Sequence, residues 1–351
     1  MFSMAMSHGD PLRHRIALVT SGLGTRYGGI GVVDRMIASA LAANHELLLW
    51  EHPAFWPRFL RIPAIAWRTG IGGLKRPDLV IYDHVHLAVL HTLIPTLKGI
   101  PYVVFIHGVE LWEPLPERRR RALEGADLLV TNSATTANEA RKANPWLPDI
   151  KVTWLGVPRQ SEPVDVSKSP PVGVMVGRIL KIERYKGHDA VLDAWPIIRS
   201  AVPGARLIIV GTGDDEDRLR ERVSNERRRG VDFCGRLTDA QRDEIVRSGR
   251  LLFFPSTGEG FGLAGVEAAS AGVPFVGLAG TVTEELFPPG TGAVLAKKGD
   301  GQSIAEAALP ALSDAQHAAQ LGQAARARVE EYFLEEHFEK RFLEAIAPLM
   351  P

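Results

Sequence analysis

Short β-rich runs alternate with helical stretches along almost the whole chain, and this alternation constrains the fold more than any other feature. Alternating strands and helices predict parallel sheets with helices on both faces. The predicted strands form two sets: RIALVT (15–20), ELLLW (46–50), DLVIY (78–82), PYVVFI (101–106), DLLVT (127–131) and KVTW (151–154), then VGVMVG (172–177), ARLIIVG (205–211), VDFCG (231–235), LLFFP (251–255), PFVGL (274–278) and GAVLA (292–296).

A polar, proline-rich stretch separates the two sets, and we predict a linker over residues 159–171. The α/β pattern therefore predicts two doubly wound, Rossmann-like domains, residues 1–158 and 172–332, that face each other across a cleft. The tail, residues 333–351, is helical by composition, with an apolar face at Phe333, Phe338, Phe342 and Ile346. Ligands of such sheets bind beyond the carboxyl ends of the strands, so we expect the functional residues in the loops that follow the strands.

Composition agrees with a soluble protein of two domains. The chain has 351 residues, 45% of them apolar and 23% charged. The formal net charge is zero, so nothing indicates nucleic acid as a partner. Residues 1–160 carry 18 Lys and Arg against 13 Asp and Glu, or +5, whereas residues 161–351 carry 23 against 28, or −5. The basic half could face an anionic acceptor or lipid surface, or could be an ordinary solvated face.

Few features of the sequence indicate the cellular compartment of the protein. Cys234 is the only cysteine, so no intrachain disulfide can form. The first 15 residues lack the apolar core of a signal peptide, and no apolar run reaches membrane-spanning length. We therefore predict a cytoplasmic protein, and leave open peripheral contact with the inner face of a membrane.

The segment GEGFGLAGVEAASAGVP (258–274) places Glu259 in a glycine-rich turn after a strand and Glu267 near the start of a helix. A helix N-terminus at this edge suits phosphate, which carboxylates would repel. A carboxylate does suit a vicinal diol, because it accepts two hydrogen bonds, so sugar hydroxyls are the favoured ligands. The alternative is structural: Glu267 complements the helix dipole and Glu259 is a turn residue.

A second loop, in VGRILKIERYKGHD (176–189), joins a strand to a helix and contains Arg178 and Lys186. A guanidinium and an ammonium group together could neutralise a diphosphate and stabilise it as a leaving group. The alternative is a solvated basic loop made by Lys181, Arg184 and Lys186.

The glycines of TSGLGTRYGGIG (20–31) follow the first strand but lack the spacing of a dinucleotide-binding turn. Glu51 lies near the end of the second strand, but before His52 and Pro53, so no acidic residue is cleanly placed to hold a ribose. These observations disfavour a nicotinamide-type site. The glycines more simply let the loop pass close to a ligand.

Histidines follow two other strands of the first half. His107 ends a strand at the edge where ligands bind, so a structural and a functional role are both open. The segment YDHVHLAVLH (82–91) collects Asp83, His84, His86 and His91, but His86 and His91 do not share a helix face. We therefore predict no metal site here.

Taken together, these segments resemble the retaining glycosyltransferases of family 4. EGFGLAGVEAASAGVPFV matches the E-x7-E signature of that family closely, and VGRILKIERYKGHD, VFIHG and RYGGIG occur in the expected order. The resemblance spans nearly all of the chain. It implies the GT-B fold, in which two Rossmann-like domains face across a cleft and a C-terminal helix, here 333–349, crosses back to the first domain.

The resemblance also implies a role for each candidate residue. Glu267 would hold the ribose hydroxyls of a nucleotide, and Glu259 the hydroxyls of the transferred sugar. Arg178 and Lys186 would grip the diphosphate, and His107 would reach the sugar from the first domain. Backbone positions would complete the donor site: Gly28 and Gly29 against the phosphates, Gly235 and Leu237 near the base, and Phe261, Gly262 and Leu263 in the signature loop.

The implied reaction moves a mannose- or glucose-type hexose from a UDP- or GDP-sugar to a glycan or lipid-linked acceptor, with the anomeric configuration kept. It needs no metal and no cofactor besides the donor. The rival enzyme is a nucleotide-sugar epimerase of the same architecture, and the rival binder is a non-catalytic nucleotide-sugar protein. Three departures from the family pattern are Ala264 for a common proline, a longer loop between Arg178 and Lys186, and Asp83 near a frequent histidine.

Overall fold

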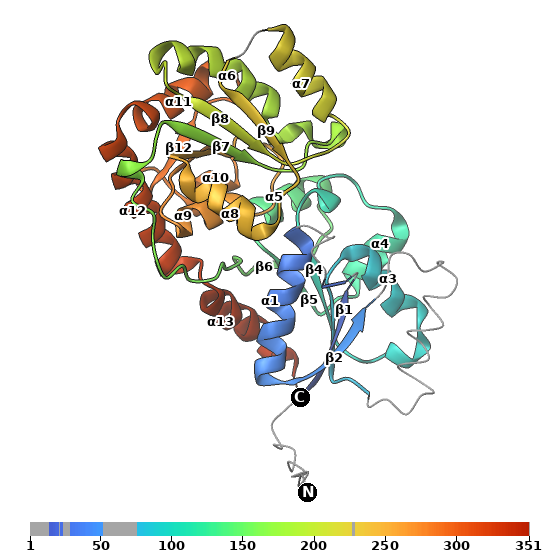
Figure 1. Cartoon of the computed structure of the whole chain (residues 1–351). Coiled ribbons are helices and arrows are strands. Elements are labelled where there is room, and N and C mark those ends of the chain that lie inside the picture. The colour runs from blue at the N-terminus through green and yellow to red at the C-terminus, as the bar shows by residue number, and fades with distance from the viewer. Residues whose placement is uncertain (1–13, 21, 24–28, 52–75, 227–228, 351) are drawn as a thin grey trace, which may run out of the picture. The chain divides into compact units, whose positions relative to one another are not determined.

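The computed structural model describes residues 14–20, 22–23, 29–51, 76–226 and 229–350, and they form two compact units (Figure 1). Unit 1 takes in residues 1–132, 136–154 and everything from Glu336 onward. Unit 2 takes in residues 133–135 and 155–335. The sequence places the corresponding boundaries at residues 158, 171 and 332.

Unit 1 is built on a parallel sheet in the order β2-β1-β3-β4-β5-β6, counted over the described residues. The strands are β1 (Arg15–Thr20), β2 (Glu46–Glu51), β3 (Leu79–Tyr82), β4 (Tyr102–Ile106), β5 (Leu128–Thr131) and β6 (Ile150–Val152). The helices of this region are α1 (Gly29–Asn44), α3 (Val85–Leu93), α4 (Glu117–Glu124), α5 (Ala134–Ala143) and α13 (Glu335–Ile346), with short 3₁₀ turns η2 (Pro95–Leu97) and η3 (Val109–Leu111).

Unit 2 repeats the architecture, with a described sheet in the order β12-β11-β10-β7-β8-β9. The strands are β7 (Val172–Val176), β8 (Arg206–Val210), β9 (Val231–Gly235), β10 (Leu251–Phe253), β11 (Phe275–Leu278) and β12 (Ala293–Ala296). The helices are α6 (His188–Ala201), α7 (Glu216–Asn225), α8 (Asp239–Ser248), α9 (Leu263–Ser270), α10 (Val282–Leu286), α11 (Gly301–Ser313) and α12 (Ala315–Tyr332), with 3₁₀ turns η4 (Val166–Lys168) and η5 (Lys181–Lys186).

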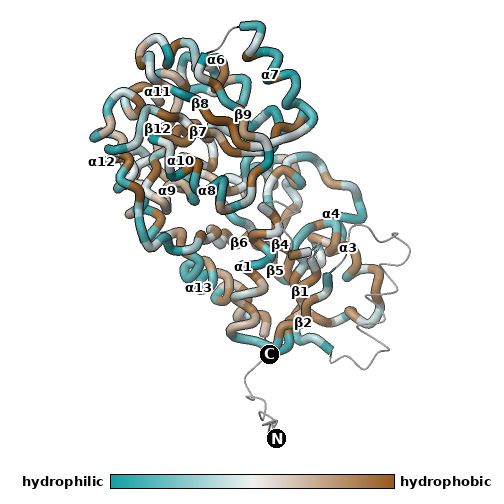
Figure 2. Tube along the Cα trace, viewed as in Figure 1, coloured by the Kyte–Doolittle hydropathy of each residue, from teal (hydrophilic) through white to brown (hydrophobic). Residues whose placement is uncertain are grey.

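The central strands are apolar because helices cover both faces of each sheet. All four residues of β3 and all of Ile16–Val19 in β1 are fully buried. Figure 2 shows this as hydrophobic strands inside each unit and hydrophilic surface on helices such as α7. All strand pairs between the described strands are parallel. The structure thus confirms the predicted α/β class of two doubly wound, parallel-sheet domains.

In each sheet, the first strand in the chain lies between two later ones, so the winding reverses beside it. In unit 2, β7 lies between β8 and β10. In unit 1, β1 lies between β2 and β3. In each sheet, the loop after this first strand therefore lies beside the loop after a neighbouring strand, at the carboxyl edge of the sheet. Ligands of doubly wound sheets bind at this kind of reversal point.

The stretch with the predicted linker, residues 159–171, belongs to unit 2 and packs against it. The backbone N–H of Val164 donates to the carbonyl of Ala271 over 2.8 Å, and Val166 is fully buried. The guanidinium of Arg250 donates to the carbonyl of Ser169. The predicted linker, rich in proline and polar residues, is therefore an irregular segment that packs against unit 2.

The C-terminal tail divides its apolar residues between the two units. Helix α12 ends at Tyr332, and the side chain of Phe333 packs in unit 2 against Phe261 and Phe287, with ring centroids 5.9 and 5.7 Å away. Helix α13 follows, and its buried residues Phe338, Phe342 and Ile346 belong to unit 1. The break comes at Phe333, whose backbone is not helical (φ −124°, ψ 29°).

Candidate functional site

The predicted site loops of unit 2 follow two neighbouring strands. β7 pairs with β10, and Met175 lies opposite Phe253 near their carboxyl ends. Residues 177–187 follow β7, and residues 254–262 follow β10. Because the strands are parallel, both loops leave the sheet at the same edge, and they bring Lys186 and Glu259 together although 73 positions separate them in the chain.

Lys186 and Glu259 form an ion pair at this edge. Lys186 Nζ donates to Glu259 Oε1 over 2.7 Å, and the two side chains are only 18% and 20% exposed. Ser256 Oγ donates to the same oxygen at the longer distance of 3.4 Å. The ammonium also lies 5.7 Å from the centre of the Tyr185 ring. A cation and a carboxylate are therefore held side by side at this edge of the sheet.

Two glycines let the loop after β10 take its path. A Cβ at Gly258 would lie 2.7 Å from the ring of Tyr185, so a side chain there would collide with it. Gly262 has a positive φ of 84° and caps α9, and a Cβ on it would lie 2.8 Å from the Phe254 ring. Tyr185 itself is neutral at physiological pH, because burial and the carboxylates of Glu183 and Glu259 raise its pKa to about 12.

Glu267 lies one turn into α9 and faces a partner that the sequence analysis did not identify. Arg242 of α8 places Nη2 3.7 Å from Glu267 Oε2. The Glu267 side chain keeps 36% of its surface exposed, yet its apolar surroundings raise its pKa, an effect that Arg242 opposes. The capping box of Thr238 and Gln241 marks the start of α8 in the sequence, but nothing local indicates which residue Arg242 meets.

Arg178 and Glu183 form a second pair in the loop after β7. The guanidinium of Arg178 donates to Glu183 Oε1; the Arg178 side chain is 66% exposed, and Glu183 is buried. Glu183 Oε2 has no hydrogen-bond donor within the part of the chain that the structure describes. The carboxylate at the base of the loop therefore anchors Arg178, while most of the guanidinium stays accessible to an anion.

Of the three cations in the alternative of a solvated basic loop, Lys181 and Arg184 are exposed, but Arg184 and Lys186 are also held by ion pairs. Arg184 donates from Nε and Nη2 to both carboxylate oxygens of Asp215, over 2.9 and 2.8 Å. Asp215 is buried and also accepts from Arg218, which donates in turn to Asp189 at the start of α6. The loop that carries Lys186 is thus tied by charged groups to α6 and α7.

Replacing Asp215 with asparagine is expected to lower the free energy of unfolding by about 1–3 kcal/mol, because two guanidinium groups lose a buried carboxylate. Both arginines are partly exposed, which keeps the effect near the lower figure. The bonds from Arg218 and Arg184 hold the Asp215 pKa below its usual range, so this stability is present above the ordinary carboxyl range and is lost as the pH falls. Denaturant unfolding at pH 7 and pH 3 measures it, with the exposed Asp217→Asn as control.

The other residues predicted to bind the nucleotide-sugar donor lie in the following places. Gly235 ends β9 with a positive φ of 67°, and its carbonyl accepts from Gly211. Leu237 follows it and is half-buried, Phe261 and Gly262 are buried, and Leu263 begins α9 half-buried. Gly29 is the exposed first residue of α1, and Gly28 lies outside the described residues.

His107 follows β4 in unit 1 and is fixed by three groups. Its Nε2 lies 2.6 Å from the backbone oxygen of Asp83, and because a carbonyl only accepts, Nε2 carries the hydrogen. The His107 backbone N–H donates to Glu110 Oε1 over 2.5 Å, and its carbonyl accepts from Asn132 Nδ2 over 2.8 Å. His107 therefore keeps Nδ1 for other interactions, at the carboxyl edge of the unit 1 sheet.

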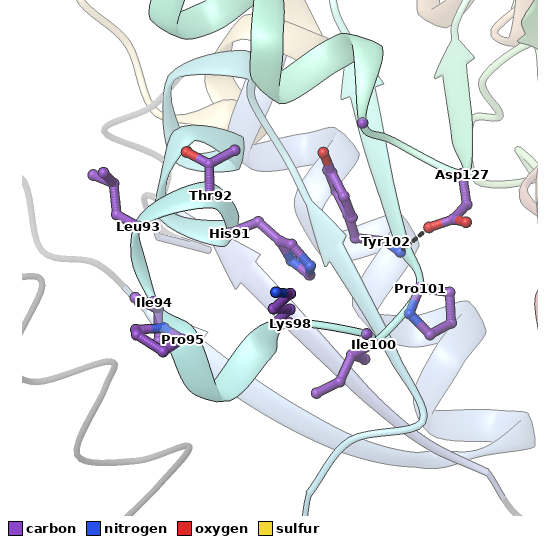
Figure 3. A pocket seen from close by; sticks show the side chains of 12 residues that line it. His91, Thr92, Leu93, Ile94, Pro95, Lys98, Ile100, Pro101, Tyr102 and Asp127 are labelled. Carbon is purple, nitrogen blue, oxygen red and sulfur yellow. Dashed lines mark hydrogen bonds between the residues drawn. The ribbon is translucent and has the colours of Figure 1, made fainter.

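The histidines of 82–91 separate along α3. His84 caps the helix, its Nδ1 lies 2.6 Å from Nδ1 of His86, and burial lowers its pKa to about 4. His91 sits at the other end of α3, in a cavity of about 650 Å³ beside the start of β4, where its ring stacks on Tyr102 at 3.9 Å (Figure 3). Within the described residues, no group of three or more His, Cys, Asp or Glu side chains is placed to hold a metal ion.

Two family patterns match this chain, one over each half. The pattern of the family described as Glycosyltransferase Family 4 matches residues 13–160, and that of Glycosyl transferases group 1 matches residues 170–314. Glycogen synthase of Mycobacterium tuberculosis is 31% identical over 276 residues, 72% of this chain and 64% of that protein. N-acetyl-alpha-D-glucosaminyl L-malate synthase of Bacillus anthracis is 24% identical over 92% of this chain and 86% of its own length.

A solved structure shares the fold. The Anabaena protein Alr3699/HepE, in complex with UDP-glucose, superposes with a TM-score of 0.76 over 96% of this chain and 100% of its own, at 19% sequence identity. The two family patterns together cover most of both units. The chain belongs to glycosyltransferase family 4.

Proposed function

We propose that the protein transfers a hexose from a nucleotide-diphosphate sugar to an acceptor hydroxyl, with retention of the anomeric configuration. The observation that supports this best is the Lys186–Glu259 ion pair at the junction of β7 and β10, with Glu267 one turn into the helix that follows the Glu259 loop. It combines a cation for a diphosphate with carboxylates for sugar and ribose hydroxyls at the edge where such sheets bind ligands.

The donor is proposed to be a UDP- or GDP-sugar with a mannose- or glucose-type hexose. The Anabaena structure contains UDP-glucose, and another relative, from Corynebacterium glutamicum, is named as a GDP-mannose-dependent mannosyltransferase. Glu267 would hold the ribose, and Arg178 and Lys186 the diphosphate. Gly29 and His107 of unit 1 keep the roles that the resemblance gives them.

In the proposed mechanism the protein works by positioning and by stabilising charge. Negative charge grows on the diphosphate as the glycosidic bond breaks, and preorganised cations such as Lys186 stabilise it most in the transition state. Neither Glu259 nor Glu267 acts as a covalent nucleophile. The leaving phosphate oxygen takes the proton of the acceptor hydroxyl on the same face of the sugar, as the family resemblance implies.

The acceptor is proposed to be a glycan or a lipid-linked sugar of a cell-surface polysaccharide or glycolipid, reached from the cytoplasmic side. The basic charge of residues 1–160 supports contact with an anionic membrane, and it includes four consecutive arginines, 118–121, on α4. No described helix has the length and apolar character needed to cross a bilayer. Sedimentation with anionic vesicles at low and high salt tests the contact.

A thermal-shift panel of UDP, GDP, ADP and their sugars tests the donor class. A ligand at 100 times its dissociation constant should stabilise the fold by about 2.7 kcal/mol. Incubating the stabilising donor with and without candidate acceptors then separates the activities. A product that forms only with an acceptor supports transfer, while an altered donor sugar without acceptor would mean epimerisation.

Treatment with a chelator is expected to leave turnover unchanged, because Arg178 and Lys186 supply the positive charge that a metal ion would otherwise bring to the diphosphate. The measurement is the transfer rate before and after chelation, and after adding back magnesium or manganese. Complete loss of activity that either metal restores would contradict the role given to the two cations.

A further inference from the structure

A buried cluster of two carboxyl groups and a hydroxyl lies in unit 1, where β1 and β3 end side by side. Thr20 is the last residue of β1, Asp34 lies on α1, and Asp83 directly follows β3; all three are fully buried. Thr20 Oγ1 donates to Asp34 Oδ2 over 2.7 Å. Val19 of β1 lies opposite Tyr82 of β3, and the backbone N–H of Asp83 donates to the Val19 carbonyl over 3.1 Å, so Asp83 lies beside Thr20 at the ends of the two strands. Oδ1 of Asp34 and Oδ1 of Asp83 are both buried there, and the two carboxyl groups interact electrostatically.

Asp34 Oδ1 is buried and receives no hydrogen bond from any described residue. Two ionised carboxylates in contact would repel each other in a low-dielectric environment, whereas one proton between them forms a hydrogen bond and removes a charge. We propose that Asp34 and Asp83 share one proton in the folded protein, and that this proton holds the start of the β1–α1 connection and His107 in place for donor binding. The role of this proton in donor binding rests on the proposed function.

Two contacts lead from the cluster to the functional edge of unit 1. Thr20 Oγ1, whose hydrogen points to Asp34, accepts from the backbone N–H of Gly22 over 3.0 Å and so fixes the first residue after the strand. The backbone oxygen of Asp83 accepts from His107 Nε2. Asp34 touches no proposed ligand, so it is a positioning residue.

The charges around the cluster agree with one shared proton. Burial raises the pKa of Asp34 to about 8, the neighbouring Asp83 adds to the effect, and Arg35 on the same helix opposes it only weakly. Glu51 at the end of β2 accepts a hydrogen bond from the backbone N–H of Leu23. After β4, His107 contacts the backbone oxygen of Asp83, and Glu110 accepts from the backbone N–H of His107. Among these described neighbours, Arg35 is the cation that acts on Asp34.

The first test is the pH dependence of stability, which needs no enzyme activity. Because the Asp34 pKa is raised in the folded state, stability is fully present below the ordinary carboxyl pKa and is lost as the pH rises toward about 8. The unfolding equilibrium constant of the wild type should therefore rise about tenfold per pH unit across that window, relative to Asp34→Asn, in which an amide replaces the protonated acid. The exposed Asp149→Asn serves as the matched control and should follow the wild type.

If the unfolding equilibrium constants of the wild type and Asp34→Asn changed with pH in the same way, the shared proton would be overturned. If the variant does not fold, infrared spectroscopy of the wild type decides the same point. A protonated carboxyl band should be present at pH 6 and fade above pH 8. Its absence at pH 6 would equally overturn the proposal.

The second test is the link to the site. Amide hydrogen exchange at residues 16–23 should accelerate above pH 8 in the wild type relative to Asp34→Asn. The kcat/KM for the donor should fall about tenfold per pH unit above pH 8 in the wild type and stay level in the variant, if the form without the proton is inactive. Equal exchange and equal pH profiles would overturn the link and leave the shared proton standing. Absence of transfer by either protein would instead count against the proposed function.

Discussion

Exchange of Lys186 for glutamine is expected to lower turnover by about a hundred- to a thousandfold, as when one preorganised donor to a developing negative charge is removed. The ammonium is held 2.7 Å from Glu259 at the junction of β7 and β10, so it needs little reorganisation to act on the diphosphate. Glutamine keeps a polar group that can donate hydrogen bonds, but it is one atom shorter than lysine and carries no charge. Steady-state transfer kinetics with a saturating donor measure the effect.

Lys181→Gln is the matched control for this experiment. Lys181 lies in the same loop and is exposed, and it is held through its backbone N–H, which donates to Asp214 Oδ1 over 2.8 Å. Turnover by this variant should stay close to that of the wild type. Equal losses in the two variants would show that the loop needs positive charge in general, and would remove the specific role given to Lys186.

Glu259→Gln and Glu267→Gln are expected to separate catalysis from nucleotide binding. Glu267 is proposed to hold the ribose, present in donor and product alike, so its variant should bind the bare nucleoside diphosphate about 1–3 kcal/mol more weakly. Glu259 is proposed to touch only the sugar, so its variant should lose about ten- to a thousandfold in turnover with nucleotide affinity nearly intact. Calorimetry and a transfer assay on both variants measure the two effects.

The ion pair makes glutamine the right replacement at position 259. An amide oxygen can still accept the hydrogen bond from Lys186 Nζ, so the ammonium stays in place while the carboxylate charge is lost. An equal loss of nucleotide affinity in Glu259→Gln and Glu267→Gln would show that the division of roles between the two carboxylates is wrong.

The strands and the loops that follow them could be predicted because their signals are local. Buried parallel strands appear in the sequence as short apolar runs, such as Ile16–Val19, and their carboxyl ends share one edge of the sheet. That rule predicts Arg178, Lys186 and Glu259 at one edge of unit 2, where the loops after β7 and β10 leave the sheet. The spacing of the two glutamates also put Glu267 on the helix that follows.

The partners of these residues could not be predicted, because they depend on how distant segments pack. The approach of Arg242 to Glu267 depends on how α8 and α9 lie, and the bond from Arg184 to Asp215 depends on the loop after β8. Periodicity likewise treated Phe333 as part of one apolar helix face, because a spacing of five residues does not reveal the break before α13.

The central claim is that the edge of unit 2 formed by the loops after β7 and β10 binds a nucleoside diphosphate through Lys186 and Glu267. Calorimetric titration of the wild type, Lys186→Gln, Glu267→Gln and Lys181→Gln with UDP and GDP tests it most directly. The account predicts that one of the two nucleotides binds at a single site, and that its affinity falls in the first two variants but not in Lys181→Gln. Binding that is unchanged in both Lys186→Gln and Glu267→Gln, or no binding of either nucleotide, would contradict it.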